Sequence, residues 1–139
     1  MPKYVHEGTP IPVPTPVTQP FWDATRDHRL MLQRCDKGHT FYYARTHCPE
    51  CLSPETEWVQ ASGRGKLYSY TVARREQSPE FANDLPYIIA AITLEEGPRM
   101  TSLLVEADPD NVQIDGLVEV VWDDVSAELS LPFFRPAQS

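Results

Sequence analysis

The sequence predicts a mainly β protein with a short N-terminal helix, a small cysteine-containing knuckle and a five-stranded barrel. Five short segments rich in aromatic and β-branched residues follow one another between residues 66 and 134. The three cysteines all lie between residues 35 and 51. Six of the fourteen prolines fall within the first 20 residues, where they exclude a regular helix or sheet. Together these observations divide the chain into four consecutive parts.

The first part is a proline-rich arm over residues 1–17. Proline at every second position from 10 to 16 favours an extended chain that lies across another surface, although a disordered tail fits the pattern equally well. A short helix follows over Thr18–Asp27, with Thr18 or Gln19 as its cap and Pro20 in its first turn. Leu30–Leu32 then begin a strand, so that residues 18–34 form a helix and a lead-in strand.

The last part, residues 56–139, reads as a barrel. Gly63 and Gly65 predict a bulge or a bend before its first strand. Five short strands without a long helix favour a Greek-key barrel of the oligonucleotide/oligosaccharide-binding (OB) type, although a different small sandwich fits nearly as well. The expected strands are Lys66–Arg74, Tyr87–Leu94, Met100–Val105, Val118–Trp122 and Leu129–Phe134.

The knuckle, residues 35–55, has the spacing of a metal site. Cys48 and Cys51 are separated by two residues, which lets both sulfurs converge on one ion, and Cys35 lies thirteen positions upstream. His39 is the nearest donor after Cys35, whereas His47 is adjacent to Cys48, and adjacent side chains diverge. The sequence therefore predicts a structural zinc held by Cys35, His39, Cys48 and Cys51, the alternative being a knuckle that has lost its metal.

The net charge of −8 is unevenly distributed. No Lys or Arg lies between Arg99 and Arg135, whereas the segment from Trp58 to Arg75 has four basic residues and no acid. An acidic protein repels a phosphate backbone, so nucleic acid is a poor candidate for the main partner. A local basic strip suits a small phosphorylated ligand better.

Motifs for autonomous catalysis are missing from the sequence. There is no G-x-S-x-G elbow, and Gly63–Lys66 is too short for a phosphate-binding loop. Asp123 and Asp124 are expected to form a solvated turn rather than an acid–base pair. The chain is therefore expected to show no activity by itself.

Several stretches in a fixed order resemble a known family. This family, long catalogued as a domain of unknown function, is associated with acyl-CoA and joins a rubredoxin-like zinc ribbon to an OB fold. The resemblance covers about residues 18 to 137, and the usual second cysteine of the first pair is replaced here by Gly38. The matching stretches are Pro20–Trp22, Leu32–Cys35, Cys48–Cys51, Ala61–Thr71, Leu85–Tyr87 and Leu131–Pro136.

The resemblance implies a non-catalytic, acyl-CoA-binding accessory subunit of a thiolase-like or lipid-transfer-type enzyme. Such an enzyme makes or breaks a carbon–carbon bond in an acyl-CoA thioester, as a thiolase, a retro-aldolase or an acyltransferase. The alternatives are a partner of an acyl-CoA hydratase and an OB-fold protein that binds single-stranded nucleic acid.

Coenzyme A needs cations for its phosphates and an aromatic face for its adenine. The residues expected to supply them are Arg64, Lys66, Tyr68, Arg74 and Arg75. Apolar residues near the ends of the chain are expected to face the partner subunit, namely Phe21, Trp22, Phe133 and Phe134. Because the chain shows no signal peptide and no apolar run of membrane-spanning length, a cytoplasmic location is expected.

Overall fold

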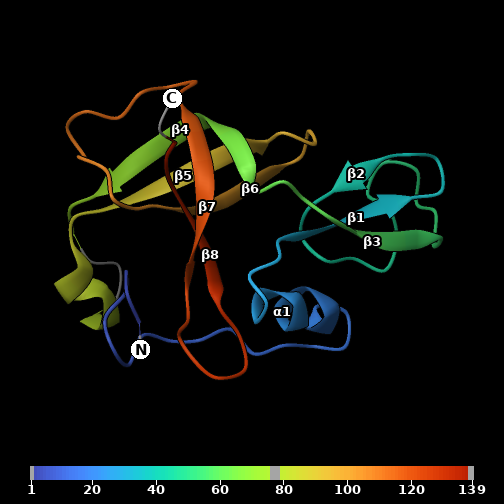
Figure 1. Cartoon of the computed structure of the whole chain (residues 1–139), viewed down its shortest axis with the longest axis horizontal. Coiled ribbons are helices and arrows are strands. Elements are labelled where there is room, and N and C mark those ends of the chain that lie inside the picture. The colour runs from blue at the N-terminus through green and yellow to red at the C-terminus, as the bar shows by residue number, and fades with distance from the viewer. Residues whose placement is uncertain (1, 76–78, 138–139) are drawn as a thin grey trace.

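The computed structural model describes residues 2–75 and 79–137. It contains a small three-stranded sheet in the order β2-β1-β3 and a closed barrel in the order β4-β5-β6-β8-β7, which Figure 1 shows side by side. The elements are α1 (Gln19–Thr25), β1 (Met31–Cys35), β2 (Thr40–Phe41), β3 (Thr56–Gln60), β4 (Arg64–Ala73), the 3₁₀ helix η1 (Pro79–Asp84), β5 (Tyr87–Leu94), β6 (Arg99–Leu104), β7 (Leu117–Asp123) and β8 (Leu131–Pro136).

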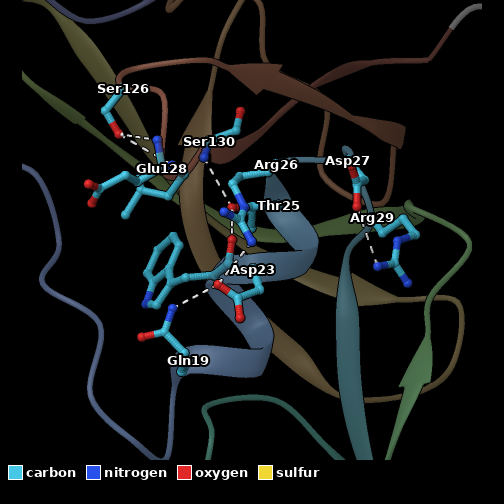
Figure 2. A network of polar contacts seen from close by, with 11 residues as sticks. Gln19, Asp23, Thr25, Arg26, Asp27, Arg29, Ser126, Glu128 and Ser130 are labelled. Atoms are coloured by element: carbon cyan, nitrogen blue, oxygen red, sulfur yellow. Dashed lines mark hydrogen bonds and ion pairs between the residues drawn. The ribbon is translucent and has the colours of Figure 1, made fainter.

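Helix α1 is anchored to the barrel through Thr25. The expected helix is confirmed, with Pro20 in its first turn, although it ends at Thr25 and the Thr18 side chain makes no capping hydrogen bond. The buried Thr25 hydroxyl donates to the Trp22 carbonyl (2.6 Å) and accepts from the Ser130 backbone N–H (3.0 Å), as Figure 2 shows for Thr25 and Ser130. The contact joins residues 105 positions apart and fixes the helix against the loop before β8.

The small sheet holds the cysteine knuckle. Strand β1 pairs antiparallel with β2 through Gln33 and Phe41, and with β3 along its whole length. The sequence placed the start of the barrel domain at residue 56, but β3 begins there and pairs with β1 in the small sheet. The Gln33 side chain is buried and bonds both the N–H and the carbonyl of Arg45, which ties the knuckle loop to β1.

All five expected barrel strands are present, and they close into the predicted five-stranded barrel. Strand β4 pairs with both β5 and β7, and the parallel pairing of Leu104 with Phe134 joins β6 to β8. Gly65 lies in the part of β4 that pairs with both β5 and β7, and an added Cβ there would come within 2.5 Å of the Thr93 carbonyl oxygen. The register shift in β4 falls between Leu67 and Ser69, after the two glycines where it was expected.

The barrel core includes two aromatic residues that the sequence assigned to a partner interface. Phe134 is fully buried and Phe21 is 7% exposed, and both belong to the same apolar cluster as Leu67 and Ile92. Phe133 is also buried, and Trp22 packs partly buried against that cluster. Phe21 and Phe134 point into the core, whereas Phe133, on the opposite face of β8, has its ring 6.2 Å from that of Tyr4 in the arm. The chain itself therefore covers these three phenylalanines, which corrects their assignment to a partner interface.

The proline-rich arm lies along the barrel. The backbone N–H groups of Lys3, Tyr4 and Val5 donate to the Asp123 carboxylate over 2.6, 2.7 and 3.2 Å. Asp123 is completely buried, so the expectation of a solvated turn is wrong for this residue. It holds for the neighbouring Asp124, whose side chain is 60% exposed and accepts a hydrogen bond from His28.

In the described part of the chain, no helix combines the length and apolar character needed to cross a membrane. The cytoplasmic location stays a prediction.

Candidate functional site

The four predicted metal ligands come together at one end of the small sheet. Cys35 ends β1, His39 precedes β2, and Cys48 and Cys51 lie in the loop between β2 and β3. One donor atom from each of these residues lies within 4.8 Å of all the others. Cys35 and Cys48 are buried, which keeps solvent away from two of the sulfurs.

The distances between the donor atoms match the edges of a zinc tetrahedron. The Cys35 Sγ lies 3.4 Å from the His39 Nδ1 and 3.8 Å from the Cys51 Sγ, and the Cys48 Sγ lies 3.7 Å from the same Nδ1. Zinc–sulfur bonds of about 2.3 Å and zinc–nitrogen bonds of about 2.0 Å give tetrahedral edges of roughly 3.8 and 3.6 Å. The residues therefore fit a zinc ion, with His39 Nδ1 as the fourth donor.

Backbone N–H groups aimed at the sulfurs favour the thiolate form that a metal requires. The N–H groups of Lys37 and His39 lie 3.3 and 3.4 Å from the Cys35 Sγ, and that of Glu50 lies 3.4 Å from the Cys48 Sγ. Burial raises the pKa of the Cys35 thiol, but the hydrogen bonds from His39 and Lys37 outweigh it and lower this pKa to about 7. The knuckle is thus prepared electrostatically for a cation.

His47 lies outside the donor cluster. Its Nδ1 faces the Thr46 hydroxyl at 2.9 Å, and it is not among the four residues whose donor atoms converge. Gly38, at the position of the missing cysteine, has a φ of +88° and donates its N–H to the Cys35 carbonyl. This tight turn brings His39 back to the metal position, which is how the knuckle completes four donors with three cysteines.

The predicted coenzyme-binding strip divides into two groups. Arg64, Lys66 and Tyr68 point outward from the beginning of β4, while Arg74 and Arg75 follow its end and are exposed. The 10-residue length of β4 separates Arg64 from Arg74 by about 30 Å at the usual strand rise. The two groups therefore belong to different regions of the surface.

The first group contains a cation that sequence reasoning missed. The Arg99 guanidinium lies 3.6 Å from the centre of the Tyr68 ring, because β6 runs beside β5 next to β4. Arg64 forms an ion pair with Glu95 at 3.1 Å, and the hydrogen bond to this carboxylate raises the pKa of Arg64. Tyr68 is 51% exposed, so its ring lies at the surface rather than in the barrel core. Only the strand pairing reveals the proximity of Arg99.

The knuckle exposes two large side chains on unusual backbone. Tyr43 and Leu52 have φ angles of +61° and +62°, and their side chains are 54% and 72% exposed. Such a left-handed conformation costs a residue with a Cβ about 1–2 kcal/mol. Leu52 also lines a groove together with Val17 of the arm.

Models of two protein families match consecutive parts of the chain. The ChsH2 rubredoxin-like zinc ribbon domain matches residues 22–57, and the ChsH2 C-terminal OB-fold domain matches residues 58–123. The first model covers β1, β2 and the start of β3, and the second covers the barrel strands β4 to β7.

Individual relatives give the same result. A DUF35 domain-containing scaffold protein of Methanothermobacter thermautotrophicus is 39% identical over 92 residues, which are 66% of this chain and 68% of that protein. A probable enoyl-CoA hydratase alpha subunit of Thermomonospora curvata is 39% identical over 119 residues, 84% of this chain. The chain spans only 37% of the length of that hydratase subunit.

Among solved structures, a chain titled Ltp2-ChsH2(DUF35) aldolase is similar to this protein with a TM-score of 0.81 and 34% identity. The match covers 92% of this chain and 100% of that chain. With the two domain models in the same order, the chain belongs to the DUF35 family of ChsH2-type proteins, in which a zinc ribbon precedes an OB fold.

Proposed function

We propose that this chain is the accessory subunit of a thiolase-like enzyme that makes or breaks a carbon–carbon bond in an acyl-CoA thioester. The observation that carries the proposal is the similarity to the DUF35 chain of an aldolase, which extends over the full length of that chain. The relatives described as scaffold proteins support a role in assembly.

In this proposal the reactive groups belong to the partner. The three cysteines of the chain converge with His39 on one metal position, so a bound zinc would keep them from acting as nucleophiles. The zinc would stabilise the fold of the knuckle, whose own buried cluster contains only Cys35, Phe41 and Cys48. Its function would be to hold the exposed loops of the knuckle in shape.

The partner surface is proposed to lie on the knuckle and the adjacent arm. Leu52 and Val17 are 72% and 38% exposed and line one groove, and contiguous exposed apolar groups mark interaction sites. A permanent complex would bury an area on the order of 2,000 Å². Leu52, kept in a strained conformation, is expected to lie near the centre of this contact.

The first test is assembly with any thiolase-like protein encoded in the same operon. The two proteins should co-purify, and Leu52→Asp should prevent the association while the zinc content and the circular dichroism stay unchanged. Ile114→Asp is the control, because Ile114 is 53% exposed in the loop before β7. Failure of the wild-type chain to bind any thiolase-like subunit of its own operon would refute the thiolase-like partner.

The coenzyme is proposed to bind at the beginning of β4, where Arg64 and Lys66 would contact its phosphates and Tyr68 its adenine. Arg74 and Arg75 form the second, separate candidate group. In the complex, neutralising Arg64 and Lys66 together should raise the KM for acyl-CoA more than it lowers kcat, the pattern of lost uniform binding. The control is the pair Arg26→Gln and Arg29→Gln, which removes two exposed arginines elsewhere.

A short thioester without the nucleotide separates coenzyme contact from docking. Loss of phosphate contacts should affect only the full-length coenzyme, whereas a weakened subunit interface would affect both substrates alike. Equal damage to both substrates would therefore refute the coenzyme site and leave the accessory role intact. The isolated chain should turn over neither substrate.

A hydratase partner is the second candidate. Two relatives are described as alpha subunits of an enoyl-CoA hydratase and of a 3-oxo-4,17-pregnadiene-20-carboxyl-CoA hydratase. The two proposals differ in the reaction of the complex. Addition of water to an enoyl-CoA would favour the hydratase, and cleavage or formation of a carbon–carbon bond would favour the thiolase-like partner.

A further inference from the structure

A cavity of about 510 Å³ lies at the end of the barrel where β5 begins and β6 ends. Residues of the arm, of η1 and β5, and of the end of β6 with the loop after it enclose the cavity, and Figure 1 shows the arm beside η1. Its volume falls within the range of sites that hold small molecules. Neither the metal centre nor the proposed coenzyme contacts at the beginning of β4 line it.

The lining is mostly apolar. Ile89 and Leu103 face each other across the β5–β6 pairing, and both contribute to the wall. The other main apolar groups come from the arm, η1 and the ends of the strands, namely Val5, Phe81, Tyr87 and Val105. An apolar group that enters such a cavity leaves water without losing hydrogen bonds, which favours its binding.

The charged groups at the rim are paired with one another. The Tyr4 hydroxyl donates to the Glu106 carboxylate, which also lies 3.5 Å from the Arg135 guanidinium. On the other side, the His6 Nδ1 lies 2.7 Å from the Asp84 carboxylate. A charged ligand would have to displace one of these partners, whereas an uncharged ligand would leave the pairs intact.

Lys3 is the basic residue of the lining, and its charge is compensated as well. Its ammonium lies 5.2 Å from the centre of the Tyr4 ring, and its charge helps to lower the pKa of Glu106, after the larger effect of the Tyr4 hydroxyl. The charge of Lys3 thus interacts with the Tyr4 ring and the Glu106 carboxylate, so the cavity has little electrostatic attraction for an anionic ligand.

The arm forms one wall of the cavity because its backbone is held by Asp123. Lys3, Tyr4 and Val5 all line the cavity, and the same three residues donate their N–H groups to that buried carboxylate. Without these hydrogen bonds the wall would open to solvent. The cavity therefore depends on a segment that reaches it from the opposite end of the sequence.

We propose that this cavity is a binding site for an uncharged apolar molecule or group, closed on one side by the N-terminal arm. The inference is independent of the catalytic partner and of the coenzyme contacts.

The test uses two fluorescent probes that share one aromatic framework. N-phenylnaphthylamine is uncharged, and anilinonaphthalene sulfonate adds a single negative charge. The zinc-loaded full chain should bind one uncharged probe per protein, with an affinity at least tenfold higher than for the sulfonate. Equal affinity for both probes, or no saturable binding of the uncharged one, would overturn the proposal.

Substitutions that fill the cavity test whether the probe binds there. Ile89→Trp should lower the affinity for the uncharged probe at least tenfold, and Leu103→Trp from the facing strand provides a second variant should the first not fold. Leu117→Trp is the control, because Leu117 is 57% exposed on β7 and does not line this cavity. Undiminished binding of the uncharged probe by a folded cavity variant would show that the probe binds elsewhere and would refute the site. If neither variant folds, the comparison of the two probes on the wild-type protein still tests the proposal.

Discussion

Replacing Asp123 by Asn should release the arm from the barrel. The carboxylate receives N–H groups from Lys3 at 2.6 Å, Tyr4 at 2.7 Å and Val5 at 3.2 Å, and it is fully buried. A hydrogen bond to a charged group contributes about 1.5–3 kcal/mol net, and Asn retains one acceptor oxygen while its amide group opposes the donors. Asn can keep the oxygen that accepts from both Tyr4 and Val5 but loses the bond from Lys3, and the two remaining bonds weaken to those of a neutral acceptor, so arm docking loses about 3 kcal/mol.

Hydrogen exchange measures this loss directly. About 3 kcal/mol corresponds to a factor of about 100 in the docking equilibrium, so the protection of the amides of residues 3–5 should fall by about that factor. The unfolding midpoint should fall less, because the arm can leave while the barrel stays folded. Asp124→Asn is the matched control, since it removes the same charge from a side chain that is 60% exposed. Unchanged protection in Asp123→Asn, or an equal loss in the control, would refute this account of the arm.

Three further predictions concern the metal, the pH dependence and the barrel. His39→Ala should lower the zinc retained during dialysis against a chelator, while His47→Ala should leave it unchanged; the reverse result would move the fourth ligand to His47. The Tyr4 hydroxyl and then Arg135 lower the pKa of Glu106, so its contribution to stability is present above the pKa of the unfolded chain and is lost as the pH falls through the lower folded value. Urea titrations between pH 6 and about 3 should show this loss in the wild type and less of it in Glu106→Gln. Gly65→Ala places a Cβ within 2.5 Å of a backbone oxygen of β5 and should reduce the free energy of unfolding by about 1–3 kcal/mol; an unaltered denaturation midpoint would contradict the close approach.

Local patterns in the sequence were sufficient for helix α1, the five barrel strands and the grouping of the four donor residues. The β-branched and aromatic segments predicted five strands, and the structure contains them. The spacing of Cys35, Cys48 and Cys51 placed His39 as the fourth donor, and the structure brings its Nδ1 to the cysteines. These features were predictable because strand propensity and metal-ligand spacing are properties of short stretches of chain.

The remaining features depend on contacts between distant segments, which a single sequence does not encode locally. Asp123 and Asp124 look alike in the sequence, yet only Asp123 is covered, because an arm about 120 positions away donates its N–H groups to it. Phe21 belongs to the core because Thr25 docks α1 beside the start of β8, and Phe134 because β8 closes the barrel between β6 and β7. Likewise, Ile89 and Val5 line one cavity only because the arm crosses the end of the barrel. The sequence determined the strands and the polar and apolar side chains that they carry. The closure of the barrel and the docking of the arm and the helix decided which side chains are buried, which are paired and which remain exposed for binding.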